Sequence, residues 1–163
     1  MVSRSASDGA RTVTLTAQAL TLPKMLDERL AHLTPNERAA LAALVDRLRR
    51  RYGDDLLRVV LYGSKARGDF DDESDLDVLI VVRMPEDAYR QYWNEIVDLT
   101  WEIELAFGIV TSLIIKSEGD YATMHKHRLL LARNIEQDGI ELWTMQPKGL
   151  TFEYVLPKPT TTW

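Results

Sequence analysis

Two carboxylates and a glycine–serine pair give this chain its clearest capacity for chemistry. Asp75 and Asp77 open an apolar run, and ten residues separate Asp75 from Gly63-Ser64, which end an earlier apolar run. Alternate residues of a strand point to one face, so both carboxylates are predicted to project together. A glycine permits close backbone approach, and successive N–H groups at the start of a short helix cradle an anion. Two carboxylates beside an anion nest predict a bound cation.

Mg²⁺ with a nucleoside triphosphate suits this arrangement, because Mg²⁺ prefers one or two carboxylates plus phosphate oxygens to an all-protein cage. Two such ions about 3.5–4 Å apart would clamp an in-line displacement at phosphorus. Two other ligand sites fail on spacing. A P-loop requires Lys and then Ser or Thr after its second glycine, whereas Asp69-Phe70 follows Gly68. An EF-hand begun at Asp69 would place Ser74 where glycine is required.

The spacing from Gly63-Ser64 to Asp75-x-Asp77 resembles the motif of the DNA polymerase β nucleotidyltransferase superfamily. The stretches 64–69 and 74–77 resemble its minimal nucleotidyltransferase (MNT) branch, with a likeness from about Thr34 to Trp143. The resemblance implies a polymerase β-like fold and the following roles. Gly63, Ser64, Lys65 and Arg67 would bind the nucleotide, and Asp75 and Asp77 would be the catalytic ligands of Mg²⁺ or Mn²⁺. The alternative is a solvated acidic loop between two strands, whose carboxylates only keep the sheet edge soluble.

Ser112 is the point at which the chain departs from that family. Aligned by the apolar residues that follow, it occupies the position where the superfamily usually has a third carboxylate. A hydroxyl cannot replace a carboxylate as a general base, and the lost charge weakens the hold on a second Mg²⁺. Three other acids are candidates for substitution. They are Glu102, Glu104 and Glu118.

Hydrophobic periodicity predicts the elements that position these residues. Thr34-Pro35-Asn36-Glu37 predicts a helix start with a capping threonine, a proline at N1 and a glutamate at N3, and Gly53 predicts its end. β-branched runs at 59–62, 78–82 and 109–115 predict strands. The order of elements predicts an α+β domain with a short mixed sheet and helices packed on one side.

Two further helical patterns follow the second strand. A helix from Pro85 to Gly108 carries an aromatic stripe that we expect to pack in the core rather than to stack on a nucleobase. A helical stretch starting at Ser117 and ending at Gly139 precedes a final strand. Residues 1–33 are predicted to be a tail with a peripheral strand at Thr12–Leu22, 34–145 the nucleotidyltransferase domain, and 146–163 an extended arm.

Composition narrows the class of protein. The chain has 163 residues, 45% of them hydrophobic and 28% charged, which is typical of one soluble globular domain. It has no cysteine, which excludes disulfides and thiolate metal sites and is compatible with a cytoplasmic location. No apolar run is long enough to span a membrane. A net charge of −5 argues against nonspecific nucleic-acid binding, and we expect the arginines at 47 and 49–51 to complement a helix dipole rather than to contact RNA.

The expected activity is Mg²⁺-dependent transfer of a nucleoside monophosphate, AMP from ATP in the expected case, to an acceptor hydroxyl. MNT proteins resembling this chain are often paired with a HEPN-type toxin, which some modify by adding AMP, so the resemblance implies a partner protein as the acceptor. The alternative is a regulatory or interaction module that binds nucleotide but has lost turnover through Ser112. Self-association stays open at this stage.

Overall fold

The strands predicted from the apolar runs form the centre of one sheet. The computed structural model describes residues 24–71 and 73–145. Within them, β1 (Leu56–Tyr62) and β2 (Leu76–Val82) lie between β4 (Ile140–Thr144) and β3 (Thr111–Ser117), in the order β3-β2-β1-β4. β1 is antiparallel to β2 and to β4, whereas β2 and β3 are parallel. The predicted α+β class with a short mixed sheet is therefore confirmed.

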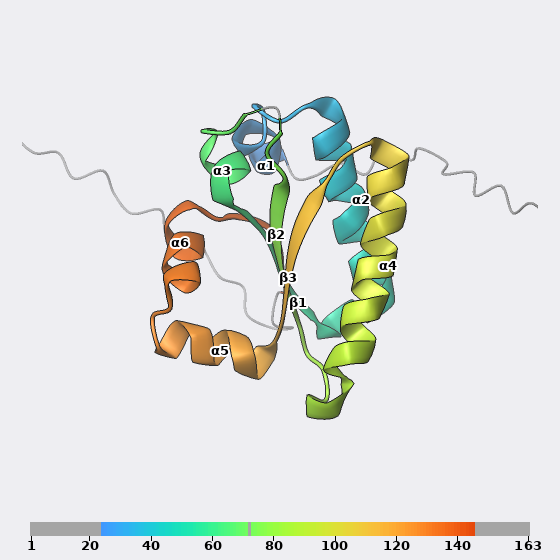
Figure 1. Cartoon of the computed structure of the whole chain (residues 1–163), viewed down its shortest axis with the longest axis vertical. Coiled ribbons are helices and arrows are strands. Elements are labelled where there is room, and N and C mark those ends of the chain that lie inside the picture. Colours follow the sequence, from blue (N-terminus) through green and yellow to red (C-terminus); the bar gives the residue numbers. More distant parts are fainter. Residues whose placement is uncertain (1–23, 72, 146–163) are drawn as a thin grey trace, which may run out of the picture.

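Six α-helices accompany the sheet in the described residues (Figure 1). They are α1 (Lys24–Arg29), α2 (Pro35–Tyr52), α3 (Gly63–Arg67), α4 (Tyr89–Phe107), α5 (Glu118–Lys126) and α6 (Leu130–Asp138). The predicted start of α2 is confirmed in detail. The Thr34 side chain accepts from the Glu37 amide, and the Glu37 side chain accepts from the Thr34 amide, which completes a capping box.

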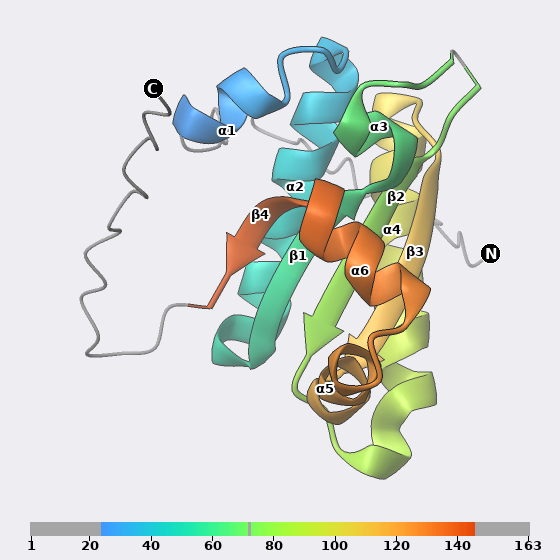
Figure 2. The same cartoon turned by 90° about the vertical axis from the view of Figure 1, so that its left-hand side faces the viewer.

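The helices cover both faces of the sheet, so the expectation that they lie on one side is wrong. α2 and α4 pack on one face and α5 and α6 on the other (Figures 1 and 2). Val78 and Ile80 belong to the core beneath α2 and α4, whereas Leu79 and Val81 belong to a second core with residues of α5 and α6. The physical reason is visible in the sequence, because an unbroken apolar strand is one that is buried on both faces.

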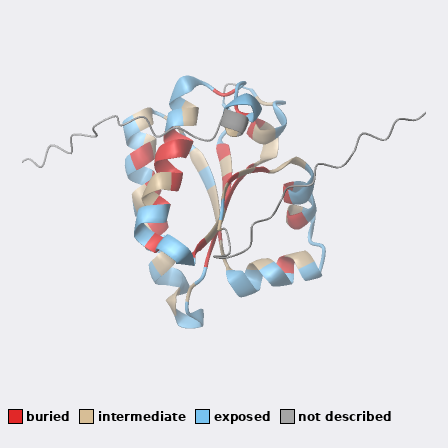
Figure 3. Cartoon of the chain, turned by 180° about the vertical axis from the view of Figure 1, so that it is seen from behind, coloured by how far each residue is buried: buried red, intermediate tan, exposed pale blue. Residues whose placement is uncertain are grey.

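The aromatic stripe of α4 is buried only in part. Ile96, Thr100 and Ile103 are buried, but Trp93 keeps 43% of its surface exposed and Tyr89 keeps 42%. Tyr89 also begins the helix, because residues 86–88 form a separate 3₁₀ turn. Figure 3 shows that buried residues gather in the strands and on parts of the helices, whereas much of the helix surface is exposed.

The helical stretch predicted from Ser117 to Gly139 is broken into two helices. Ser117 caps α5 by accepting from the Asp120 amide at 3.1 Å, as predicted. The chain then turns at residues 127–129, where Arg128 has a φ of 50°. The turn lets α6 run back over the sheet, where Ala132 and Ile135 are buried.

Packing also extends to residues before Thr34. Leu30 and Leu33 are buried in the core beneath α2, although no element was predicted there. The predicted strand at Thr12–Leu22 and the arm at 146–163 lie outside the described residues, so the domain limits stay predictions. None of the helices between residues 24 and 145 combines the length and the apolar character needed to cross a membrane.

Candidate active site

Gly63 and Asp77 lie in direct contact at the ends of the two central strands. Tyr62, the last residue of β1, is the register partner of Asp77 in β2. Gly63 follows with a φ of 74°, a conformation that side chains other than glycine rarely adopt. A Cβ at this position would lie only 2.2 Å from Asp77 Oδ2. Glycine therefore allows the start of α3 to meet the carboxylate.

The short helix α3 presents its first residues at this contact. Gly68, with a φ of 82°, ends the helix, and the amides of Gly68 and Asp69 donate to the Ser64 carbonyl at 2.8 and 3.2 Å. The first amides of a helix have no intrahelical acceptors, so Gly63 and Ser64 offer donors beside Asp77. We call Gly63-Ser64 the glycine–serine corner.

Negative charge gathers next to the glycine–serine corner. Burial raises the pKa of Asp77 above its ordinary value, and repulsion from Asp75 adds to this, while a hydrogen bond from Ser112 and the charge of Arg67 oppose it. Burial, and then the charge of Asp77, raises the pKa of Tyr62 to about 12. A divalent cation would relieve the repulsion between the two carboxylates, so the donor set fits Mg²⁺.

The protein supplies only part of a coordination shell. Across residues 24–71 and 73–145, no group of three or more His, Asp or Glu side chains is arranged to hold a metal ion. Two carboxylates alone suit Mg²⁺, which usually keeps several waters and takes further oxygens from substrate phosphates. The arrangement is therefore one that a metal and a nucleotide would complete together.

Ser112 lies beside Asp77 on the neighbouring strand. The two residues are register partners in the parallel pair β2 and β3, and they are joined by a side-chain hydrogen bond. Ser112 itself is exposed at the edge of the sheet. A carboxylate at this position would face the same space as Asp77, whereas the hydroxyl adds no charge there.

The three acids considered as substitutes are engaged elsewhere. Glu102 pairs with Arg47 at 2.6 Å, and Glu118 pairs with Arg83 at 3.2 Å. Glu104 accepts from both the amide and the hydroxyl of Thr111 at 2.7 Å. These contacts give each acid a structural partner, so the structure offers no support for any of them as the missing carboxylate.

Arg67 lies close enough to the site to act on it. Its Nε donates to both Asp69 carboxylate oxygens at 3.1 Å, and an Nη atom lies 3.9 Å from Asp138 Oδ2. The hydrogen bond to Asp69 contributes most to raising the pKa of Arg67, and Asp77 is among the charges that act on it. Asp138, at the end of α6, was not foreseen, because nothing in the sequence pairs α6 with α3.

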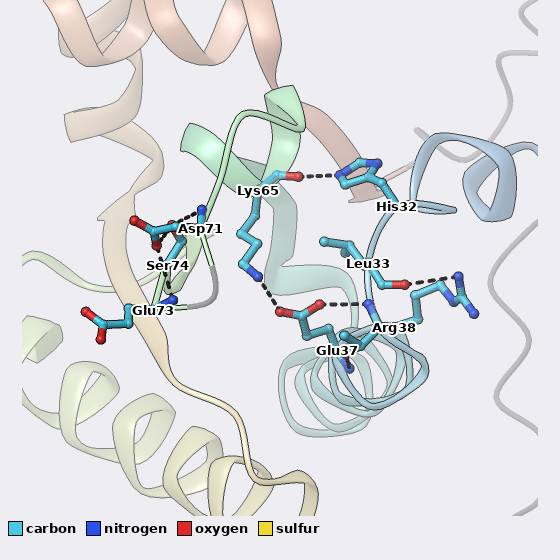
Figure 4. Close-up of polar contacts among 9 residues, drawn as sticks. His32, Leu33, Glu37, Arg38, Lys65, Asp71, Glu73 and Ser74 are labelled. Carbon is cyan, nitrogen blue, oxygen red and sulfur yellow. Dashed lines mark hydrogen bonds and ion pairs between the residues drawn. The ribbon is translucent and has the colours of Figure 1, made fainter.

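The ammonium group of Lys65 points away from the corner. The residue is 4% exposed, and its Nζ lies 2.7 Å from Glu37 Oε1 (Figure 4). The structure thus brings Gly63, Ser64, Arg67, Asp75 and Asp77 together. It does not bring the Lys65 charge to them, which disagrees with the expected phosphate contact.

A hollow of about 590 Å³ adjoins Asp75. It is bounded by the start of α2, by the loop before β2 and by the loop between α4 and β3. Its lining residues are Thr34–Glu37, Glu73–Asp75 and Gly108–Val110. Asp75 therefore borders open space that a ligand can enter.

Sequence comparison identifies the family of this domain. The family model described as "Nucleotidyltransferase domain" matches residues 41–141, which run from α2 to β4. Two proteins of Methanocaldococcus jannaschii, each named a putative protein adenylyltransferase, are similar to this chain. The first is 35% identical over 83 residues, which cover 51% of this chain and 76% of the relative. The second is 46% identical over 63 residues, which cover 38% of this chain and 61% of the relative, so less than two thirds of its length is spanned.

Solved structures show a more distant likeness. A putative nucleotidyltransferase from Sulfolobus solfataricus is 26% identical, with 67% of this chain and 83% of that chain covered and a TM-score of 0.39. A toxin–antitoxin complex with AMP-PNP is 18% identical, with 63% of this chain and 73% of that chain covered and the same TM-score of 0.39. Structural likeness at this level does not decide what a protein acts on.

Proposed function

Because the chain belongs to the nucleotidyltransferase domain family, we propose that it transfers AMP from ATP to a hydroxyl group of a protein acceptor. The observation that carries this proposal is the contact between Gly63 and Asp77, which sets backbone donors against a carboxylate that is repelled by Asp75. The names of the two Methanocaldococcus relatives support AMP as the transferred group and a protein as the acceptor. A HEPN-type partner stays a prediction within this proposal.

In the proposed reaction, the acceptor hydroxyl loses its proton to solvent water and its oxygen forms a bond to the α-phosphorus. The bond from that phosphorus to the oxygen bridging the β-phosphate breaks, and pyrophosphate leaves. Asp75 and Asp77 would hold Mg²⁺ or Mn²⁺, which would supply charge neutralisation at the reacting phosphate. The amides of the glycine–serine corner would donate to the departing pyrophosphate. Arg67 would exchange its contact with Asp69 for a phosphate oxygen, because a guanidinium binds both groups with the same geometry.

The second candidate function is a nucleotide-binding module without turnover. The position of Ser112 favours it, since this hydroxyl is the group beside Asp77 and cannot take the acceptor proton as a carboxylate would. Nucleotide binding without release of pyrophosphate would distinguish this module from the enzyme.

The test is transfer of label from α-labelled ATP to protein in the presence of Mg²⁺, with Asp77→Asn as the variant and Asp98→Asn as its control. Asp98 is an exposed acid on α4. We expect Asp77→Asn to lower transfer by at least about a hundredfold. Its melting temperature should not fall, because burial disfavours the charged form of this side chain. Equal transfer by both variants would end the assignment of Asp77.

Ser112→Asp separates the two candidate functions. If the wild type binds ATP but transfers no label, and Ser112→Asp does transfer, the chain is a module that lost its base. If the wild type transfers label, the enzyme is established. Ser112→Asn serves as the control, because it adds similar volume without a charge.

A further inference from the structure

We infer that Glu37 is a positioning residue for the glycine–serine corner and that it acts through the buried side chain of Lys65. The inference rests on the proposed function, since it assigns a task to a contact beneath the nucleotide site. It also replaces the expected phosphate contact of Lys65 with a different role. Two features support this role of Glu37: its ion pair with Lys65 is buried, and several other groups hold both side chains in place.

The ion pair is enclosed on both sides. The side chain of Lys65 is 5% exposed and that of Glu37 is 12% exposed, and their charged atoms lie 2.7 Å apart. The Phe70 ring covers the ammonium at 4.0 Å from Nζ to the ring centroid. A charge removed from water must be paired, because breaking such a pair leaves the other charge buried without compensation. Lys65 is therefore committed to Glu37 rather than free to reach a phosphate.

Hydrogen bonds to Thr34 hold Glu37 in place independently of its contact with Lys65. Its Oε2 accepts from the Thr34 amide at 2.8 Å, and its own amide donates to the Thr34 hydroxyl at 3.2 Å. Only Oε1 is left for Lys65. The capping box thus fixes the side chain of Glu37, and with it the position of Oε1, at the start of α2.

The glycine–serine corner depends on this contact because α3 is too short to be a stable helix by itself. It has five residues, and helices of this length are not stable on their own. Lys65 lies in its middle, one residue after Ser64, and is held twice. Its side chain binds Glu37, and its carbonyl lies 2.5 Å from His32 Nε2 (Figure 4). A shift of Lys65 would move Ser64 and Gly63 relative to Asp77.

The negative charge of Glu37 lets the direction of the change in nucleotide affinity distinguish positioning from long-range electrostatics. Removing the negative charge of Glu37 near a triphosphate should strengthen nucleotide binding if only long-range electrostatics matters. A positioning role predicts weaker nucleotide binding, because without the Glu37 carboxylate the glycine–serine corner is no longer held beside Asp77. If Lys65 instead contacted phosphate directly, Lys65→Met would weaken binding, but Glu37→Gln would not.

The experiment measures binding of a non-hydrolysable ATP analogue with Mg²⁺ by calorimetry for Glu37→Gln, Lys65→Met and the double variant. The control is Glu141→Gln, which breaks the ion pair between Arg58 and Glu141 on β1 and β4. We expect each single variant to weaken binding by roughly tenfold, and the double variant to lose no more than either, because both act through one contact. We expect the control to stay within about twofold of the wild type. Wild-type or tighter binding by Glu37→Gln overturns the inference.

Amide hydrogen exchange without nucleotide tests the positioning role of Glu37 separately from the proposed function. The amides of Gly68 and Asp69 donate to the Ser64 carbonyl, so their protection reports the order of α3. We expect faster exchange at these two amides in Glu37→Gln and in Lys65→Met, but not in Glu141→Gln. Unchanged exchange overturns the inference even if the wild type transfers AMP. Absence of nucleotide binding by the wild type, together with faster exchange in the variants, overturns the proposed function alone.

Discussion

Asp77 is the residue whose surroundings are most specialised. A glycine gives way to it on one side, a serine donates to it on another, and a second carboxylate repels it. Each of these neighbours acts on the carboxylate of Asp77, so we expect a change at any of them to alter ligand binding more than the stability of the fold. Gly63 offers the sharpest test, because its role is steric rather than electrostatic.

Gly63→Ala should disable the site beyond its cost in stability. The new Cβ would lie 2.2 Å from Asp77 Oδ2, and the residue would also keep a positive φ. Gly68→Ala is the matched control, because Gly68 has a φ of 82° but a Cβ added there would meet no atom within 4 Å. Both variants should lose about 1–3 kcal/mol in urea unfolding. Only Gly63→Ala should lose nucleotide binding, and equal loss in both would show that strain alone is responsible.

At the scale of elements, the site depends on how α2 holds α3. The start of α2 is set by its own capping box, and its Glu37 then reaches a helix that lies 28 residues away in sequence. Burial raises the pKa of Glu37, but hydrogen bonds from Lys65 and Thr34 outweigh it, so the pKa lies below its ordinary value of 4.5. We therefore expect the contact between α2 and α3 to become less stabilising as Glu37 is protonated at low pH.

Stability should fall in acid through this junction. A carboxylate with a lowered folded pKa contributes stability that is present above its unfolded pKa and is lost as pH falls through the folded value. Glu37→Gln lacks this contribution. Melting temperatures measured from pH 6 down to pH 3 should thus show a gap between the wild type and Glu37→Gln that narrows below about pH 4.5. A gap of constant size would mean that Glu37 stabilises the junction through packing alone.

At the scale of the whole molecule, the sheet is a layer between two cores. Leu79 and Ile80 are neighbours in β2, both fully buried, and they point to opposite faces. The face carrying Ile80 is closed by α2 and α4, and the face carrying Leu79 is closed by α5 and α6. Asp77 shares the Leu79 face by strand alternation, so the second core supports the site directly.

Leu79→Ala and Ile80→Ala test the two-sided layer. Each should cost about 2–5 kcal/mol, because each deletes buried methyl groups and leaves a cavity. Urea unfolding measures both, with Leu130→Ala as an exposed control on α6 that should cost less than about 1 kcal/mol. A sheet covered on one side would make one of the two core variants as mild as the control.

The sequence by itself determined the local features. The capping box at Thr34 and Glu37, the cap at Ser117 and the central strands each depend on residues a few positions apart, and the motif from Gly63 to Asp77 lies within one short stretch of the chain. Such signals are legible because backbone hydrogen bonding and side-chain alternation act over short distances along the chain. The family resemblance implied that Ser112 lies near Asp77, and the parallel pairing of β2 and β3 makes the two residues register partners.

Only the tertiary structure decided which distant groups meet. It paired Lys65 with Glu37 and brought Asp138 of α6 to Arg67. It also gave Glu102, Glu104 and Glu118 structural partners of their own. It also broke the last helical stretch at Arg128 so that α6 could close the second core. Long side chains such as lysine and arginine reach several partners, and burial selects among them. Periodicity records that a residue is buried or exposed, but the partner it finds depends on how the layers pack.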